Sequence, residues 1–166
     1  MIVYGVFEEI KDRISSILSG KRVFILGIGN ELRGDDYVGS YIALNLKLRS
    51  LKNVVDAGLS PESFLEVAAR TKPDAVVFID AVEASLEPGA IVFASVEEVE
   101  KSEVVFPTTH KPSYSMLYRY LKFRLPKAEQ YLLGVQVVDT SFGKNMTETI
   151  KRIADKLIDF LSTLVQ

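Results

Sequence analysis

The sequence has no cysteine, no tryptophan and a single histidine among its 166 residues. Without cysteine the chain can form no disulfide, no thiolate metal site and no cysteine nucleophile. Its formal net charge of -2 gives no overall basic signal for nucleic-acid binding. No apolar run approaches the ~20 residues that a membrane-spanning helix needs, and charged residues from Glu8 to Arg13 are unlike a signal peptide. We therefore expect a cytoplasmic protein that neither binds nucleic acid nor inserts into a membrane.

The length and composition are typical of one globular domain. Hydrophobic residues make up 48% of the chain and charged residues 25%, which is ordinary for a soluble fold. The sequence shows no internal repeat, linker or low-complexity segment. We expect a single domain over residues 1–166, with residues 1–20 as an N-terminal extension built on an amphipathic helix from Val6 to Leu18.

Apolar runs alternate with segments of helical periodicity along the chain. Strands are expected over residues 22–28, 53–56, 75–79, 90–94 and 130–138, and helices over 6–18, 36–48, 60–71, 112–125 and 146–165. Residues 95–111 are expected to be loop. The link from Ile79 to Ala90 is too short for a helical crossover, so the fourth strand should run antiparallel. The pattern predicts a three-layer α/β/α domain in which the first and third strands are neighbours.

Carboxylates follow three of the expected strands. The first strand leads into a glycine-rich turn and then into Asp35 and Asp36, and the next two strands end at Asp56 and Asp80. In open α/β sheets ligands bind beyond the carboxyl ends of the strands, so the loops carrying Asp36 and Asp80 should meet there. Two simpler roles stay open. Asp35 or Asp36 is placed to cap the following helix, and Asp56 is placed to bond backbone amides in its own turn.

The sequence also suggests a metal site. Asp36, Asp80 and His110 are oxygen and nitrogen donors on three different loops, a set that suits a borderline divalent ion such as nickel or zinc. Asp80 ends a strongly apolar strand, where an unpaired carboxylate is costly, so a cation or a hydrogen-bond donor must meet it. For His110 the alternative is a surface or capping histidine. Tyr114 and the other tyrosines of the helix 112–125 are expected to serve packing.

Two other chemistries have less support in the sequence. Gly27 and Gly29 begin a dinucleotide-binding fingerprint, but Leu32 stands where the third glycine belongs, and the acidic pair would repel a pyrophosphate. Asp56 does stand where a ribose-binding acid would be expected, so nucleotide binding stays an alternative. There is no Gly-x-Ser-x-Gly elbow and no cysteine, which argues against a hydrolase with a serine or cysteine nucleophile.

Residues 27–39 (GIGNELRGDDYVG) resemble the opening motif of the nickel-iron hydrogenase maturation endopeptidases, G-x-G-N-x-L-x-x-D-[DE]-x-x-G. Later segments are similar to further motifs of that family in the same order: Asp56-Ala57-Gly58, Ile79-Asp80-Ala81, Pro88-Gly89, Thr108-Thr109-His110 and Gly134-Val135-Gln136. Aspartate as the second acid, together with the Thr-Thr-His segment, resembles the branch that serves hydrogen-evolving, formate-hydrogenlyase-type hydrogenases. Ala57 and Val137 depart from the family pattern, which often has glycine and proline there.

The resemblance implies a fold, a reaction and a site. The fold would be a phosphorylase/hydrolase-like, five-stranded and mostly parallel sheet of order 2-1-3-5-4, with strand 4 antiparallel. The reaction would remove a C-terminal extension from a nickel-iron hydrogenase large-subunit precursor after nickel insertion, with the substrate's nickel as the recognition signal. Asp36, Asp80 and His110 would contact that nickel, and Asp56 would be a further catalytic acid. A non-catalytic nickel-binding maturation chaperone with the same donors is the alternative.

Overall fold

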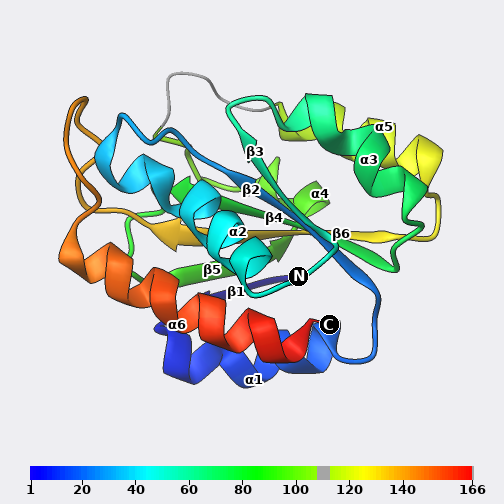
Figure 1. The fold of residues 1–166 in the computed structure, drawn as a ribbon, viewed down its shortest axis with the longest axis horizontal. Coiled ribbons are helices and arrows are strands. Elements are labelled where there is room, and N and C mark those ends of the chain that lie inside the picture. Colours follow the sequence, from blue (N-terminus) through cyan, green and yellow to red (C-terminus); the bar gives the residue numbers. More distant parts are fainter. Residues whose placement is uncertain (108–112, 166) are drawn as a thin grey trace.

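A six-stranded sheet forms the centre of the structure, and helices cover both of its faces (Figure 1). The computed structural model describes residues 1–107 and 113–165. The strands are β1 (Ile2–Gly5), β2 (Val23–Ile28), β3 (Val54–Gly58), β4 (Ala75–Val82), β5 (Ile91–Ser95) and β6 (Glu129–Gln136); the helices are α1 (Phe7–Leu18), α2 (Val38–Leu48), α3 (Leu65–Arg70), α4 (Val96–Val99), α5 (Tyr114–Arg124) and α6 (Glu148–Leu164), with short 3-10 helices η1 (Gly34–Tyr37) and η2 (Pro61–Phe64).

The central strands are buried on both faces, which explains their continuous apolar runs. Successive side chains of β2 point to opposite sides. Val23 and Ile25 join a core with α1, α2 and α6, whereas Phe24 and Leu26 join a second core with α3, α4 and α5. The sheet therefore separates two apolar layers, and the predicted three-layer α/β/α class is confirmed.

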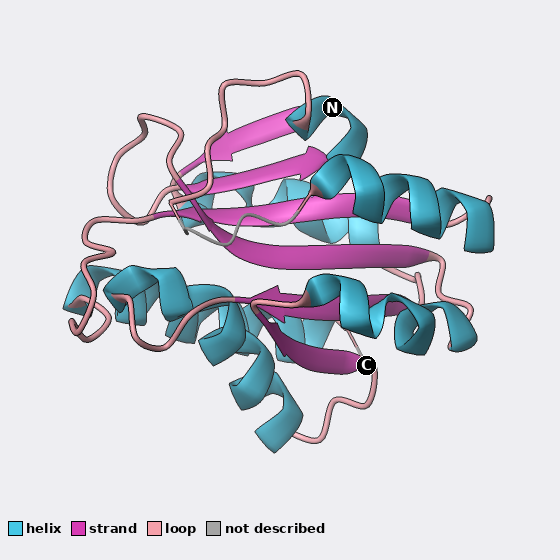
Figure 2. Ribbon diagram, turned by 90° about the horizontal axis from the view of Figure 1, so that it is seen from above, coloured by secondary structure: helices cyan, strands magenta, loops and turns pink. Residues whose placement is uncertain are grey.

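The strand order is β1-β5-β6-β4-β2-β3, and Figure 2 shows the strands side by side. β2 pairs in parallel with β3 and with β4, β4 pairs in parallel with β6, and β5 runs antiparallel to β6. The expected order and the antiparallel fourth strand are thus confirmed. The expected count of five strands is wrong, because residues 1–20 hold not only α1 but also β1, which pairs antiparallel with β5. This edge strand is too short to show a pattern in the sequence, and its pairing comes from a distant segment.

Three further boundaries differ from the sequence-based expectation. Asp80 lies inside β4 rather than after it, because pairing with Gly134 of β6 carries the strand beyond the apolar run. The helix expected from Asp36 begins as η1, and α2 itself starts at Val38. Within the expected loop 95–111, residues 96–99 form α4.

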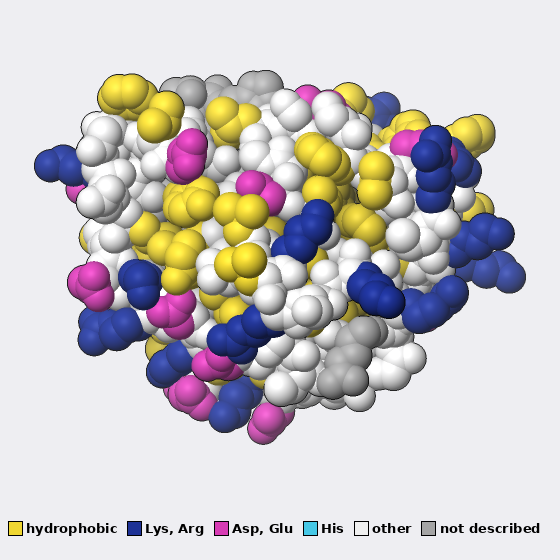
Figure 3. Space-filling model, viewed as in Figure 1, with side chains coloured by type: hydrophobic (Ala, Val, Ile, Leu, Met, Phe, Trp, Pro, Cys, Tyr) yellow, Lys and Arg dark blue, Asp and Glu magenta, His cyan; other side chains and the backbone are white. Residues whose placement is uncertain are grey.

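Charge is distributed unevenly along the strand direction. Lys and Arg side chains gather at the end of the molecule where α3 and α5 end, whereas both signs are mixed over α1 and α6 (Figure 3). Arg22, Lys72 and Lys127 belong to this basic end, since they precede β2, β4 and β6. The aspartates of interest lie toward the opposite, carboxyl ends of the parallel strands. Of the helices described, none has the length and apolar character needed to cross a membrane.

The start of α2 packs directly against the backbone of the sheet. A Cβ atom on Gly39 would lie closer than 3.0 Å to the carbonyl oxygens of Ile28 and Ile79. Glycine is therefore required here for close approach of helix and strands. This contact sets the position of η1, which immediately precedes α2, relative to β2 and β4.

We expect Gly39→Ala to lower the free energy of unfolding by at least about 1–3 kcal/mol, because the added methyl group must push α2 away from β2 and β4. Lys47→Ala, on the exposed side of the same helix, should change it by less than about 0.5 kcal/mol. Urea denaturation of both variants measures the difference. Equal stability of the two variants would contradict the close-approach argument.

Candidate active site

Asp36 is held in the turn that connects β2 to α2. Its side chain is fully buried, its backbone N–H donates to the Arg33 carbonyl at 3.0 Å, and its own carbonyl accepts from Asn30 N–H at 3.2 Å. Gly34 adopts a φ of +53°, and a Cβ there would lie closer than 3.0 Å to the Asp139 carbonyl oxygen. The glycine spacing of the motif is therefore what lets this turn form against the loop after β6.

Asp35 is also fully buried, but its carboxylate serves the backbone. It accepts from Val138 N–H and Asp139 N–H, both at 2.9 Å, and from Thr147 N–H at 2.7 Å. The Thr147 hydroxyl donates to it as well, at 2.9 Å. The proposed helix-capping role is wrong, since no side chain caps α2. Asp35 instead ties the turn before α2 to the loop after β6 and to the start of α6.

Asp80 lies on β4, on the side of the sheet that carries the α5 core. Its two oxygens accept from the Ala81 N–H at 2.8 Å and from the Tyr114 hydroxyl at 3.0 Å. None of the ion pairs formed by the described residues includes Asp80. Burial, and then the charge of Asp36, raise the pKa of Asp80 well above its ordinary value. Asp36 and Asp80 therefore lie near one another, as predicted.

Tyr114 contributes to this site in a way that the sequence did not indicate. The packing role is confirmed, since its ring stacks on Phe106 at 4.7 Å and meets the edge of Phe78 at 5.6 Å. Its hydroxyl in addition bonds Asp80. Burial and the carboxylate of Asp80 raise the pKa of Tyr114 well above its ordinary value, so the hydroxyl stays neutral and donates. No local sequence signal distinguishes this tyrosine from the others on the helix.

Asp56 lies on β3 and is half-buried. Its Oδ1 accepts from the Gly58 N–H at 3.0 Å, so the simpler role in its own turn is confirmed. It also lines a cavity of about 360 Å³ together with Glu31, Tyr37 and seven other residues, among which are neither Asp36 nor Asp80. Burial is the main cause that raises the pKa of Tyr37, and the negative charges of Asp56 and then Glu31 raise it further. Asp56 thus faces a neighbouring cavity, whose lining includes Tyr37, the residue that follows Asp36.

His110 lies outside the described residues, so its predicted role as a third donor stays a prediction. Among residues 1–107 and 113–165, no group of three or more His, Cys, Asp and Glu side chains is arranged to hold a metal ion. Within that part of the chain the structure brings together two of the predicted donors, Asp36 and Asp80.

Gln136, the last residue of β6, fixes the chain that follows β4. Its side-chain oxygen accepts from Ala84 N–H at 2.8 Å and Leu86 N–H at 3.3 Å, and its amide donates to Glu83 at 3.0 Å. The Gly-Val-Gln segment therefore has a structural role, because Gln136 holds the connection between β4 and β5 beside Asp80.

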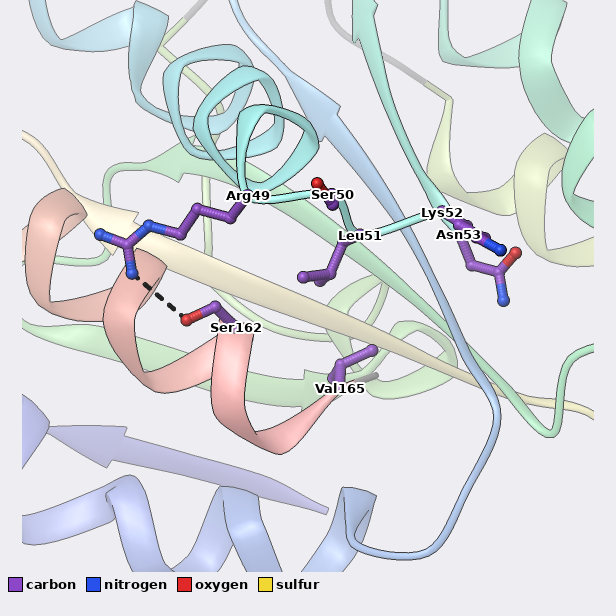
Figure 4. A pocket seen from close by; sticks show the side chains of 7 residues that line it. All are labelled: Arg49, Ser50, Leu51, Lys52, Asn53, Ser162 and Val165. Carbon is purple, nitrogen blue, oxygen red and sulfur yellow. Dashed lines mark hydrogen bonds between the residues drawn. The ribbon is translucent and has the colours of Figure 1, made fainter.

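A cavity of about 500 Å³ lies at the other end of the molecule, between residues 49–53 and the end of the chain near Val165 (Figure 4). Arg49 there donates to the Ser162 hydroxyl at 3.3 Å and pairs with Asp159 at 2.6 Å. Asn53 directly precedes β3, so this cavity lies at the amino end of that strand. It is remote from Asp36 and Asp80, and the candidate active site is the carboxyl edge between β2 and β4.

We expect Asp80→Asn to stabilise the fold near neutral pH. The pKa of Asp80 is higher in the folded protein than in the unfolded one. Its contribution to the free energy of unfolding is therefore fully present below the unfolded-state pKa and is lost as the pH rises through the folded-state pKa. The neutral amide removes this cost; its oxygen can accept from the Ala81 N–H, and its NH2 group can donate to the Tyr114 hydroxyl, which is able to accept as well as to donate. The free energy of unfolding at pH 7 should rise by about 1–3 kcal/mol, and the gain should shrink toward pH 4. Urea denaturation at both pH values tests this.

Asp35→Asn is the matched control, another fully buried aspartate. Here an amide group would face N–H donors, so stability should fall by about 2–4 kcal/mol at pH 7. A loss of stability for Asp80→Asn of the same size would show that the two carboxylates have the same structural role and would contradict the assignment.

The comparisons with known proteins agree with one another. A family model described as hydrogenase maturation protease matches residues 37–163, a span that includes Asp56 and Asp80. The hydrogenase 3 maturation protease of Escherichia coli strain K12 is 29% identical over 129 residues, covering 76% of this chain and 80% of that protein.

Two solved structures share the fold over most of their length. The crystal structure of the NiFe hydrogenase maturation protease HycI from Thermococcus kodakarensis KOD1 has a TM-score of 0.80 and 29% identity, covering 92% of this chain and 98% of that one. The solution structure of the endopeptidase HycI from Escherichia coli has a TM-score of 0.72 and 25% identity, covering 85% and 89%. The matches favour a protease over a nucleotide-binding protein or a chaperone. On the strength of the family model, which spans most of the sequence, this chain belongs to the hydrogenase maturation protease family and is a peptidase.

Proposed function

We propose that this peptidase removes a C-terminal segment from the precursor of a nickel-iron hydrogenase large subunit, and that Asp36 and Asp80 contact the nickel carried by that substrate. The first part extends the family's activity to a substrate class, and the second assigns a role to the buried carboxylates. Nickel is here part of the substrate and not a resident cofactor of the protein.

The observation that carries the proposal is the burial of Asp80 beside Asp36. An ionised carboxylate without water costs several kcal/mol unless a cation or sufficient donors compensate it. From the described residues Asp80 accepts hydrogen bonds from two neutral donors, and the charge of Asp36 adds to the cost of ionising it. Burial and this charge raise the pKa of Asp80. A divalent cation between the two carboxylates would offset both terms.

The donor types suit nickel. Two carboxylate oxygens and one imidazole nitrogen form a set that a borderline divalent ion accepts, and His110 supplies the imidazole in this proposal. In the sequence, His110 stands between Phe106 and Tyr114; Phe106 stacks on Tyr114, whose hydroxyl bonds Asp80. A nickel ion bound to the precursor would then be held by three side chains from different elements, which fixes the position of the attached chain.

Binding through nickel would place the peptide bond to be cut at the carboxyl edge between β2 and β4, where positioning supplies much of the rate acceleration. Asp56 is our candidate for the general base that activates water, because it lies on β3 beside Gly27 of β2 and is neither assigned to nickel nor, like Asp35, occupied by several backbone donors. Its half-buried position in a cavity leaves it accessible to water.

The direct test is to incubate the protein with a nickel-loaded and with a nickel-free large-subunit precursor and to measure the precursor's C-terminal mass. We expect a short peptide to be lost from the nickel-loaded form alone, because nickel supplies the contact with Asp36 and Asp80. Nickel-dependent association with an unchanged mass would instead identify a chaperone. Cleavage of both forms would contradict recognition through nickel.

Single variants should separate binding from chemistry. Asp36→Asn and Asp80→Asn should weaken association with the nickel-loaded precursor about 10–100-fold, since each removes a charged donor. Asp56→Asn should leave association intact and lower kcat by about 100-fold or more if Asp56 is the general base. Asp74→Asn is the control, because Asp74 pairs with Arg22 at the basic end of the molecule. Normal cleavage by Asp36→Asn would rule out its role.

Cleavage should decline as the pH falls. The raised pKa of Asp80 means that the protein without substrate takes up a proton there at a higher pH than an ordinary aspartate would, and nickel must displace that proton. Association and cleavage with nickel-loaded precursor, measured across pH, should therefore weaken through mildly acidic values. A flat profile down to about pH 4, the ordinary range of aspartate, would contradict carboxylate contact with nickel.

A further inference from the structure

We propose that Tyr114 is a positioning residue for this reaction, whose hydroxyl fixes the orientation in which Asp80 meets the substrate's nickel. The inference rests on the proposed function, since it assigns a second residue to the same site. It concerns a residue of α5 that would otherwise count as part of the apolar core.

The hydrogen bonds of Asp80 determine how its carboxylate can turn. The Tyr114 hydroxyl donates to Oδ2 at 3.0 Å, and the Ala81 N–H donates to Oδ1 at 2.8 Å. Each carboxylate oxygen can accept about two hydrogen bonds, so beside these two bonds from described residues each oxygen has a second acceptor direction that a cation could use. With a donor on each oxygen, rotation of the carboxylate would break at least one bond. Asp80 is thereby held in one orientation before the substrate arrives.

The tyrosine ring is itself fixed on both sides. Phe106 stacks on it with a centroid distance of 4.7 Å and an angle of 24°, and Phe78 of β4 meets it edge-on at 5.6 Å and 88°. The side chain is only 1% exposed. Because the ring cannot shift without disturbing these contacts, the hydroxyl lies at a defined point over β4. Held in this way, the donor is pre-organised, which is the property that positions a metal-binding carboxylate.

The chemistry of the tyrosine also suits this task. A lysine or arginine at the same place would bond Asp80 but would offset the negative charge that attracts nickel. A phenol hydroxyl donates a hydrogen bond and leaves the charge of the carboxylate in place. Tyr114 is the first residue of α5, where Ser113 caps the helix by accepting from Met116 N–H at 3.3 Å. Through its hydrogen bond to Asp80, Tyr114 therefore also anchors the start of α5 against β4.

The test variant is Tyr114→Phe, which keeps the ring between Phe106 and Phe78 and removes only the hydroxyl. We expect the Kd for nickel-loaded precursor to rise about tenfold or more, in line with the loss of other residues that orient metal ligands, while kcat at saturating precursor changes less. The Kd for nickel-free precursor should stay unchanged. Circular dichroism and a melting curve confirm that the variant is folded.

Tyr118→Phe is the matched control. Tyr118 lies one turn further along α5, and its hydroxyl donates to the exposed Glu97 at 3.4 Å, so this variant should bind and cleave as the wild type does. In an Asp80→Asn background, Tyr114→Phe should have little further effect on binding, because the hydroxyl acts through Asp80. If Tyr114→Phe fails to fold, Phe106→Leu, which loosens the ring and keeps the hydroxyl, should weaken nickel-dependent binding in the same selective way.

Three outcomes would overturn the inference. A wild-type Kd for Tyr114→Phe would show that the hydroxyl does not orient Asp80. Equal weakening toward nickel-loaded and nickel-free precursor would reduce Tyr114 to a structural role. An undiminished effect in the Asp80→Asn background would place its action elsewhere. All three leave the proposed function standing, whereas a wild-type protein that neither binds nor cleaves the precursor overturns the proposed function and this inference with it.

Discussion

The burial of two carboxylates at the carboxyl edge of β2 and β4 is a constraint that the surrounding structure must satisfy. Asp36 and Asp80 are both fully buried, and the charge of one raises the pKa of the other. Desolvation makes such a pair costly, so the surroundings must be rigid enough to keep it in place. The close approach of α2 at Gly39, the turn before it and the ring of Tyr114 all hold these two side chains where they lie.

Two fully buried aspartates, Asp35 and Asp80, show how differently burial can be compensated. Asp35 receives backbone N–H donors from residues 138, 139 and 147, so its carboxylate is satisfied by the fold itself. From the described residues Asp80 receives one backbone and one phenol donor, and it has a carboxylate as a charged neighbour. The first arrangement stabilises the fold, whereas the second stores a cost that a cation can relieve. This contrast is our reason for assigning a structural role to Asp35 and proposing a functional one for Asp80, since burial alone does not distinguish them.

Local sequence patterns predicted much of the fold. Apolar runs located the five longer strands, four of which, β2, β4, β5 and β6, are buried on both faces. The short link after β4 correctly required an antiparallel β5. β1 was missed because a four-residue edge strand gains its structure from pairing with β5, not from its own sequence. The end of β4 was misplaced for the same reason, since pairing with β6 extends it through Asp80.

The sequence by itself determined the family motifs, the order of the elements and the acids that end up at one edge, since spacing and hydrophobic periodicity are properties of neighbouring residues. Only the tertiary structure decided what each acid does. The partners of Asp35 lie more than 100 residues away along the chain, and Asp80 meets Tyr114 from a helix on one face of the sheet. Desolvation and hydrogen bonding depend on such distant contacts, and no local pattern encodes them.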